Sequence, residues 1–85
     1  MPLVQFTFQH GRASTVTAAG DFNGWNTPSH PLERQAGDFW ILEVELSPGR
    51  HEFKFFVDVQ QWWNDPEAPK VSNLWGSENS YLEVF

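Results

Sequence analysis

Hydrophobic and polar side chains alternate with a period of two along much of the chain, which is typical of strands that bury one face. The alternation is clearest over residues 3–8, 38–46 and 51–58. Its apolar positions are the candidate core: Val4, Phe6, Phe8, Trp40, Leu42, Val44, Leu46, Phe53, Phe55 and Val57. Trp40 lies in the middle of its segment on the apolar face, so we expect this indole to be buried.

Two of these segments are joined by a turn signature. Ser47-Pro48-Gly49-Arg50 has proline in second place and glycine in third, which suits a four-residue turn. We therefore expect residues 38–46 and 51–58 to pair as a β-hairpin.

Shorter segments complete the outline. Residues 14–19 and 81–85 predict two further strands, the second of which closes the fold. Residues 20–26 contain glycines and asparagines, which suit a backbone with positive φ. Residues 27–35 and 64–80 carry prolines and predict irregular loops.

Short strands separated by turns, without a stretch of helical periodicity, predict an all-β antiparallel sandwich. A chain of 85 residues has room for one small domain. We therefore expect residues 1–85 to form a single β-sandwich domain.

Charge and composition exclude several classes of function. The chain has 5 Lys and Arg against 11 Asp and Glu, a formal net charge of −6, which argues against binding nucleic acid or an anionic membrane. It has no cysteine, which excludes disulfides and thiol chemistry. No apolar run approaches the ~18 residues of a membrane span, and Met1-Pro2-Leu3-Val4 is not a secretory signal, so we expect a cytoplasmic protein.

The residues that usually carry catalysis are not arranged for it. His10, His30 and His51 are scattered, without metal-ligand spacing, and are expected at exposed loop or strand-end positions. Nucleophile-elbow and phosphate-loop patterns are missing. A carboxylate pair for glycoside hydrolysis needs a cleft that a sandwich of this size rarely makes. The sequence predicts no enzyme and no cofactor or metal.

The strongest chemical signal is the group of tryptophans in segments predicted as turns and loops. Trp25 follows Asp21-Phe22-Asn23-Gly24, Trp62 and Trp63 are adjacent, and Trp75 lies among small polar residues. An exposed aromatic cluster usually marks a contact site, although Trp25 and Trp75 would equally suit the ends of a sandwich as caps. In a strand, one of the adjacent pair would point inward and the other outward.

This chemistry suits a sugar ligand. A pyranose ring packs its C–H face on an indole, and its rim of hydroxyls needs amide and charged partners. Lys54 and Asn79 are candidates for that rim, although an outward-facing lysine is also an ordinary solvated position.

Four motifs in order resemble the glycogen-binding family-48 carbohydrate-binding modules, which occur in the β subunits of AMP-activated protein kinase and at the N-terminus of glycogen-branching and debranching enzymes. The resemblance extends from about Val4 to Phe85. The motifs are Ala19-Gly20-Asp21-Phe22-Asn23-Gly24-Trp25, Gly49-Arg50-His51-Glu52-Phe53-Lys54-Phe55-Phe56-Val57-Asp58, Trp62-Trp63-Asn64-Asp65-Pro66 and Val71-Ser72-Asn73-Leu74-Trp75-Gly76-Ser77-Glu78-Asn79-Ser80. The resemblance implies a small immunoglobulin-like (early-set) antiparallel β-sandwich that binds α-1,4-glucan without catalysing a reaction.

Carried over residue by residue, the resemblance implies a carbohydrate site. Trp25 and Trp62 would be its two stacking platforms. Lys54 would hydrogen-bond sugar hydroxyls from its strand, and Asn79 would do so from the last loop. Trp75 stands where the kinase module has a leucine that inserts against the sugar, and would add a third aromatic surface.

This sequence departs from the kinase pattern between residues 51–58 and the tryptophan pair. Asp58-Val59-Gln60-Gln61-Trp62 is one residue longer, which leaves two candidates for the platform. Alignment on Asn64-Asp65-Pro66 favours Trp62 over Trp63. Val59 replaces a turn glycine, so we expect the turn to take another conformation.

The expected ligand is an α-glucan polysaccharide or a maltooligosaccharide. The alternative is a protein-interaction or scaffold domain, whose partner would be a glycogen-metabolising enzyme or a kinase. Phe39 and Phe56 motivate it, because both alternate away from the core positions and would leave an apolar patch beside Trp40. An oligonucleotide-binding barrel would use the same aromatics for stacking, but the few basic residues argue against it.

Overall fold

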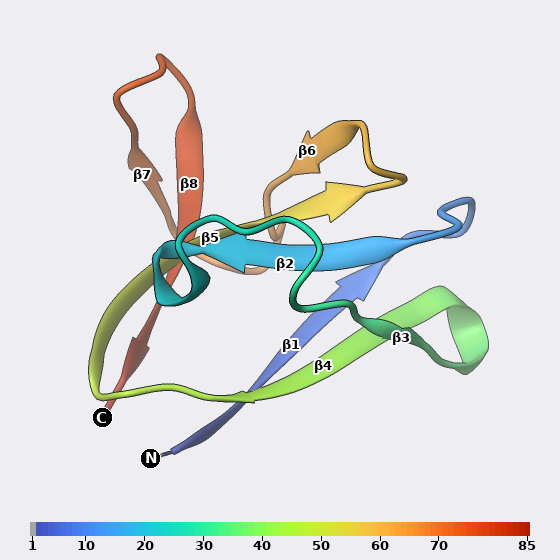
Figure 1. Cartoon of the computed structure of the whole chain (residues 1–85), viewed down its shortest axis with the longest axis horizontal. Helices are drawn as coiled ribbons and strands as arrows, with labels where there is room; N and C mark the ends of the chain where they lie inside the picture. Colours follow the sequence, from blue (N-terminus) through green and yellow to red (C-terminus); the bar gives the residue numbers. More distant parts are fainter. Residues whose placement is uncertain (1) are drawn as a thin grey trace.

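Antiparallel strands in two sheets form a β-sandwich in the computed structural model, which describes residues 2–85 and leaves Met1 outside the described residues (Figure 1). The strands are β1 (Leu3–Gln9), β2 (Val16–Gly20), β3 (Glu33–Arg34), β4 (Phe39–Glu45), β5 (Gly49–Val57), β6 (Gln61–Trp63), β7 (Lys70–Ser72) and β8 (Glu78–Val84). One-turn 3-10 helices, η1 (Asp21–Asn23) and η2 (Ala36–Asp38), precede β3 and β4. The predicted all-β sandwich is confirmed.

The smaller sheet has the order β1-β4-β3, and the larger has the order β2-β5-β8-β7. Strand β5 is the centre of the larger sheet. Its first half pairs with β8, its second half pairs with β6, and β2 lies along its other edge. Strands β2, β6 and β8 therefore all pair with β5. The loops that follow or precede these three strands are brought together at β5 as well.

The core lies between the sheets and is aromatic. Phe6 and Phe53 have ring centroids 4.9 Å apart, and those of Phe8 and Phe55 are 4.6 Å apart, each pair bridging the two sheets. All four side chains are buried, and each contributes about 1.5–3 kcal/mol by leaving water. Trp40 is 5% exposed, as predicted, and its Nε1 donates to the carbonyl of His10 at 3.3 Å.

The predicted hairpin between residues 38–46 and 51–58 is wrong. Strand β4 belongs to the smaller sheet and β5 to the larger, so the turn between them carries the chain from one sheet to the other. Gly49 (φ 128°) begins β5 at this corner. The alternation of apolar residues is the same for a hairpin and for two strands that face each other across a core, so the pattern did not distinguish them.

Two segments expected as loops contain short strands. Strand β3 lies within residues 27–35, and Pro31 of this segment bridges to Thr17. Strand β7 lies within residues 64–80, and β8 begins at Glu78, earlier than predicted. Strands of two or three residues are too short for a period of two to be visible.

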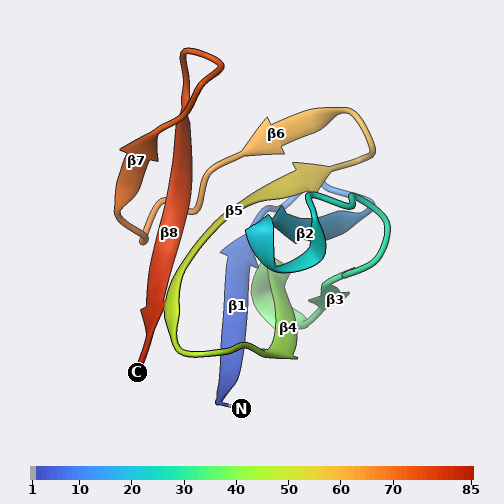
Figure 2. The same ribbon diagram turned by 60° about the vertical axis from the view of Figure 1, so that its left-hand side comes forward.

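The β7–β8 hairpin projects beyond the body of the sandwich, as the turned view shows (Figure 2). Neither of the 3-10 helices found within residues 2–85 has the length or apolar character needed to span a membrane.

Candidate functional site

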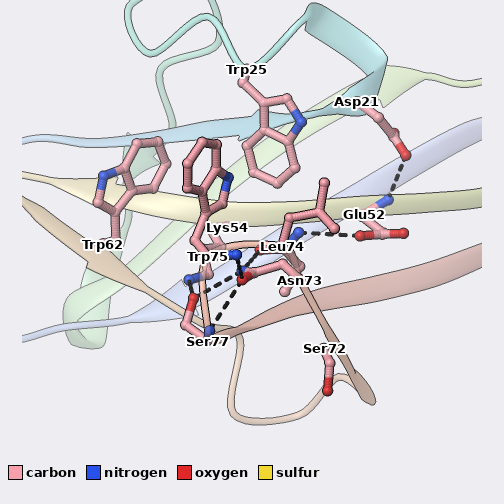
Figure 3. Close-up of a pocket in the computed structure, with 11 residues that line it drawn as sticks. Asp21, Trp25, Glu52, Lys54, Trp62, Ser72, Asn73, Leu74, Trp75 and Ser77 are labelled. Carbon is pink, nitrogen blue, oxygen red and sulfur yellow. Dashed lines mark hydrogen bonds between the residues drawn. The ribbon is translucent and has the colours of Figure 1, made fainter.

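An open groove of about 910 Å³ lies over the outer face of the larger sheet, where three segments meet (Figure 3). It is lined from the η1 loop, from β5 and β6, and from the β7–β8 hairpin. The lining residues are Asp21, Trp25, Glu52, Lys54, Trp62, Ser72, Asn73, Leu74, Trp75, Ser77 and Asn79. All the site residues predicted from the sequence are therefore brought together.

Trp25 is held by a tightly bonded loop. Gly24 and Trp25 both take left-handed backbone angles (φ 65° and 59°), and the Trp25 amide donates to the carbonyl of Gly20 at 2.8 Å. The Asn23 side chain accepts from the Gly20 amide and donates to neighbouring carbonyls. The sequence predicted positive φ in this segment, and Gly24 confirms it, but the second such residue is a tryptophan instead of an asparagine. Such a backbone is costly for tryptophan and persists because the loop is fixed.

Gly20 allows this loop to lie directly on β5. Its backbone is extended, so its role is not conformational freedom. A Cβ at this position would lie 2.3 Å from the backbone oxygen of Glu52, which no real Cβ tolerates. The absence of a side chain is therefore what brings the Trp25 loop against the strand that carries Lys54.

Trp62 occupies the outer face of the larger sheet. In the β5–β6 ladder it lies opposite Phe56, with ring centroids 4.7 Å apart. Its ring centroid is 6.5 Å from that of Trp25, at an interplanar angle of 68°. The indoles of Trp25 and Trp62 are 37% and 48% exposed, so each presents free aromatic surface to the groove.

Trp63 points to the other side of β6, as strand geometry predicts. Its ring lies 5.1 Å from His10 and 6.1 Å from Phe8, at the edge of the sandwich core. It remains 42% exposed but does not line the groove. Of the two candidates for the platform, the groove therefore contains Trp62.

The turn that leads to Trp62 keeps a left-handed backbone. Asp58 and Val59 have φ of 54° and 59°, so the expectation that Val59 changes the turn conformation is wrong. The Asp58 carboxylate accepts hydrogen bonds from the amides of Ser14 (2.6 Å) and Thr15 (3.0 Å). These bonds, with that of Thr15 the largest cause, lower the pKa of Asp58 and tie the turn to the segment before β2.

Trp75 extends from a loop organised by one asparagine. The Oδ1 of Asn73 accepts from the amides of Trp75 (2.9 Å) and Ser77 (3.1 Å), and its Nδ2 donates to Ser77 and Asn79. The indole of Trp75 is 89% exposed, and the side chain of Leu74 is almost fully exposed beside it. The predicted third aromatic surface thus lies at the tip of the β7–β8 hairpin (Figure 3).

The polar lining agrees with the prediction at Lys54 and differs from it at Asn79. Lys54 projects into the groove, and its Nζ lies 3.4 Å from the Ser77 Oγ. Asn79 is only 8% exposed and lies in β8 instead of the last loop. Its Nδ2 donates to the Glu52 Oε1 at 3.1 Å. Its side chain is therefore already engaged within the protein.

The sequence reasoning missed part of the lining. The missed residues are Asp21, Glu52, Ser72, Asn73, Leu74 and Ser77. Glu52 had a usable signal, because a spacing of two places it on the same outward face of the strand as Lys54. Leu74 had another, since it is adjacent to Trp75 in the same loop.

The histidines lie apart from one another. His10 accepts from the amides of Arg12 and Ala13, His30 bonds within the η1 loop, and the Nδ1 of His51 lies 3.5 Å from an Asp21 carboxylate oxygen. Across residues 2–85, no three His, Cys, Asp or Glu side chains are grouped to hold a metal ion.

The apolar patch expected from Phe39 and Phe56 does not form. Phe39 is 44% exposed on the outer face of the smaller sheet, whereas Phe56 packs against Trp62 on the larger sheet. A second groove of about 330 Å³ does lie between Trp40 and Phe56, bordered by Val59. Phe39 does not line this groove.

Residues 3–85 match the family described as the glycogen recognition site of AMP-activated protein kinase. Similar proteins include FLOURY ENDOSPERM 6, chloroplastic, of Oryza sativa subsp. japonica, which is 46% identical over 72 residues, 85% of this chain. They also include AMP-activated protein kinase subunit beta-1 of Rattus norvegicus, 36% identical over 87% of the chain, and subunit beta-2 of Mus musculus, 39% identical over 81%. The match covers 13% of the rice protein and 26% and 24% of the two kinase subunits.

Proposed function

The chain belongs to the family of glycogen recognition sites of AMP-activated protein kinase, the family-48 carbohydrate-binding modules, and from this premise we propose that its groove binds α-1,4-glucan on the indoles of Trp25, Trp62 and Trp75. The family has the immunoglobulin-like early-set sandwich described above. This region is a glycogen-binding module and is non-catalytic. Which residues hold the sugar, and which glucan they select, are the subject of the proposal.

The observation that carries the proposal is the convergence of three exposed indoles and a lysine in one groove. Indole faces offer the flat apolar surface that the C–H face of glucose needs, and Lys54 offers three N–H donors for hydroxyl oxygens. Each hydrogen bond contributes a net ~0.5–1.5 kcal/mol, because it replaces one with water. A short oligosaccharide is therefore expected to bind with a Kd on the order of micromolar to millimolar.

The angle between the platforms favours a curved glucan. The ring planes of Trp25 and Trp62 are inclined by 68°, so a flat ribbon of cellulose type does not stack on both at once. An α-1,4-linked chain coils, and successive glucose rings present their faces in different directions. We therefore propose glycogen-type or starch-type chains as the ligand.

The adjacent tryptophans give a matched test. In a titration of intrinsic fluorescence with maltoheptaose, Trp62→Ala should weaken binding at least about tenfold, a loss of ~1.4 kcal/mol. Trp63→Ala removes an equally large indole outside the groove and should stay within about threefold of the wild type. Equal losses in the two variants, with both folded by circular dichroism, would contradict the proposed platform.

We propose second that the module works within a larger assembly that contains a glycogen-metabolising enzyme or a kinase. The support is that the similar kinase subunits and the rice protein are several times longer than the matched region. The groove between Trp40 and Phe56 shares no lining residue with the groove that contains Trp75, so a protein bound there would leave the proposed sugar site free. Size-exclusion chromatography with a purified kinase catalytic subunit tests this, and a complex that persists at saturating maltoheptaose would support it.

A further inference from the structure

Glu52 connects the loop that carries Trp25 with the loop that carries Trp75. Its backbone N–H donates to the Asp21 Oδ2 at 3.0 Å, at the start of the loop that carries Trp25. Its Oε1 accepts from the Nδ2 of Asn79 at 3.1 Å. Asn79 in turn accepts from Asn73, whose side chain fixes the amide of Trp75. The backbone of Glu52 is therefore tied to the Trp25 loop, and its carboxylate is tied to the β7–β8 hairpin.

The second carboxylate oxygen of Glu52 is free to bind a ligand. Glu52 lines the groove and is partly exposed, and within residues 2–85 its Oε2 has no hydrogen-bond partner and no cation within 4.0 Å. None of the buried side-chain polar atoms in this part of the chain lacks a partner, so Oε2 is open to solvent. It is an open carboxylate acceptor in the lining of the groove that contains the indoles.

Glu52 and Lys54 form a complementary pair on one strand. They are two residues apart in β5 and share its outward face, roughly 7 Å apart along the strand. An ionised carboxylate only accepts hydrogen bonds and an ammonium only donates them. Sugar hydroxyls do both, so one hydroxyl can accept from Lys54 while a neighbouring one donates to Glu52. Bonds to an ionised group are about twice as strong as neutral ones.

We infer that Glu52 accepts a hydrogen bond from a glucan hydroxyl through its open oxygen, and that Asn79 is a positioning residue that acts through Glu52. The inference rests on the proposed glucan site and adds a positioning role for Asn79 to it. Asn79 is nine-tenths buried and its amide is already bonded to Asn73 and Glu52. Asn79 therefore holds the carboxylate of Glu52 in place at the groove.

The substitution Glu52→Gln tests the acceptor. The N–H of Asn79 requires an oxygen opposite it, so the new amide must turn its carbonyl oxygen towards Asn79. Its NH₂ group then faces the groove, and an acceptor becomes a donor without loss of volume. We expect maltoheptaose to bind about tenfold or more weakly, as for the loss of a bond to a charged group. The control is Glu43→Gln, which removes one negative charge at an exposed position of β4. This variant should bind maltoheptaose as the wild type does.

A second substitution tests the orientation. Adding Asn79→Asp to Glu52→Gln supplies an acceptor opposite the amide, which then turns its carbonyl oxygen back towards the groove. We expect this double variant to regain part of the lost affinity at the net charge of the wild type, because a neutral carbonyl replaces the carboxylate. If it fails to fold, Asn79→Ala in the Glu52→Gln background also releases the amide and should regain part of the affinity.

The outcomes separate this inference from the proposed function. Absence of maltoheptaose binding in the wild type would refute the glucan site itself. Wild-type binding that Glu52→Gln leaves unchanged would refute the acceptor role alone. A folded double variant that binds no better than Glu52→Gln would show that Asn79 does not act through Glu52.

Discussion

At the scale of single residues, the turn before Trp62 is where sequence and backbone disagree most. Val59 has φ of 59°, a region that β-branched residues avoid because Cβ approaches the carbonyl oxygen. The side chain is 75% exposed and gains little from packing in return. The conformation is instead imposed by Asp58, whose carboxylate is bonded to the amides of Ser14 and Thr15.

Replacing Val59 with glycine should therefore stabilise the protein. Glycine removes a left-handed strain of about 1–2 kcal/mol and adds about 0.4–1 kcal/mol of entropy to the unfolded chain. The expected gain is about 0.5–1 kcal/mol in the free energy of unfolding, measured by chemical denaturation. Val59→Ala keeps the Cβ and is the control. A glycine variant no more stable than this control would contradict backbone strain at residue 59.

Asp58 makes the stability depend on pH. Its pKa is lowered in the folded protein by the amides of Thr15 and Ser14, so its contribution is present above the unfolded pKa of about 3.9. That contribution is lost as the pH falls through the lower folded value. Asp58→Asn keeps a side chain that tolerates left-handed backbone but removes the charge.

The stability difference between wild type and Asp58→Asn should therefore be largest near about pH 7 and should shrink below about pH 4. Chemical denaturation of both proteins across this range measures it. A difference that is independent of pH would mean that the carboxylate charge does not fix the turn.

At the scale of elements, the sequence predicted strands well and their partners poorly. Alternation identified β1, β4 and β5 with their buried faces, because each is long enough to show a period of two. It did not reveal that the turn before Gly49 changes sheets, since both arrangements bury the same residues. The short strands β3 and β7 carry too few residues to show any period.

The same limit applies to the site. The indoles and Lys54 were predicted because their chemistry is distinctive in sequence. Glu52 was missed, because an outward-facing glutamate looks the same whether or not an asparagine 27 residues later holds it. Contacts between segments distant in sequence are set by the packing of the sheets and leave no local pattern.

The β7–β8 hairpin depends on Asn73 for its shape. Asn73→Ala removes the acceptor of the Trp75 and Ser77 amides, so the loop must be ordered when sugar binds. We expect affinity for maltoheptaose to fall about three- to tenfold, while the free energy of unfolding changes by less than about 1 kcal/mol. Faster hydrogen exchange at the Trp75 amide should accompany the loss. Unchanged exchange and unchanged affinity would show that the loop keeps its shape without Asn73.

At the scale of the whole molecule, we expect no contribution from long-range charge to glucan binding in the groove. The chain carries a net charge of −6, yet an α-glucan is neutral and its contacts are stacking and short-range hydrogen bonds. A single groove gives modest affinity, and a glycogen particle compensates by presenting many chains to several modules at once. We therefore expect weak binding to oligosaccharides together with firm retention on the polymer.

Binding should consequently be insensitive to salt. The Kd for maltoheptaose should change by less than about twofold between roughly 50 and 500 mM NaCl in isothermal titration calorimetry. A nucleic-acid site or another polyanion site would lose affinity steeply over the same range. Such a steep loss would indicate that charge, and not stacking, dominates the interaction.

The central claim is that α-glucan is held between indoles from three separate segments of a β-sandwich. A crystal structure of the protein with bound maltoheptaose tests it most directly. We predict glucose rings stacked on Trp25 and Trp62, with Trp75 against the chain from the β7–β8 hairpin. A maltoheptaose bound elsewhere, with the groove open and the indoles uncovered, would contradict the account.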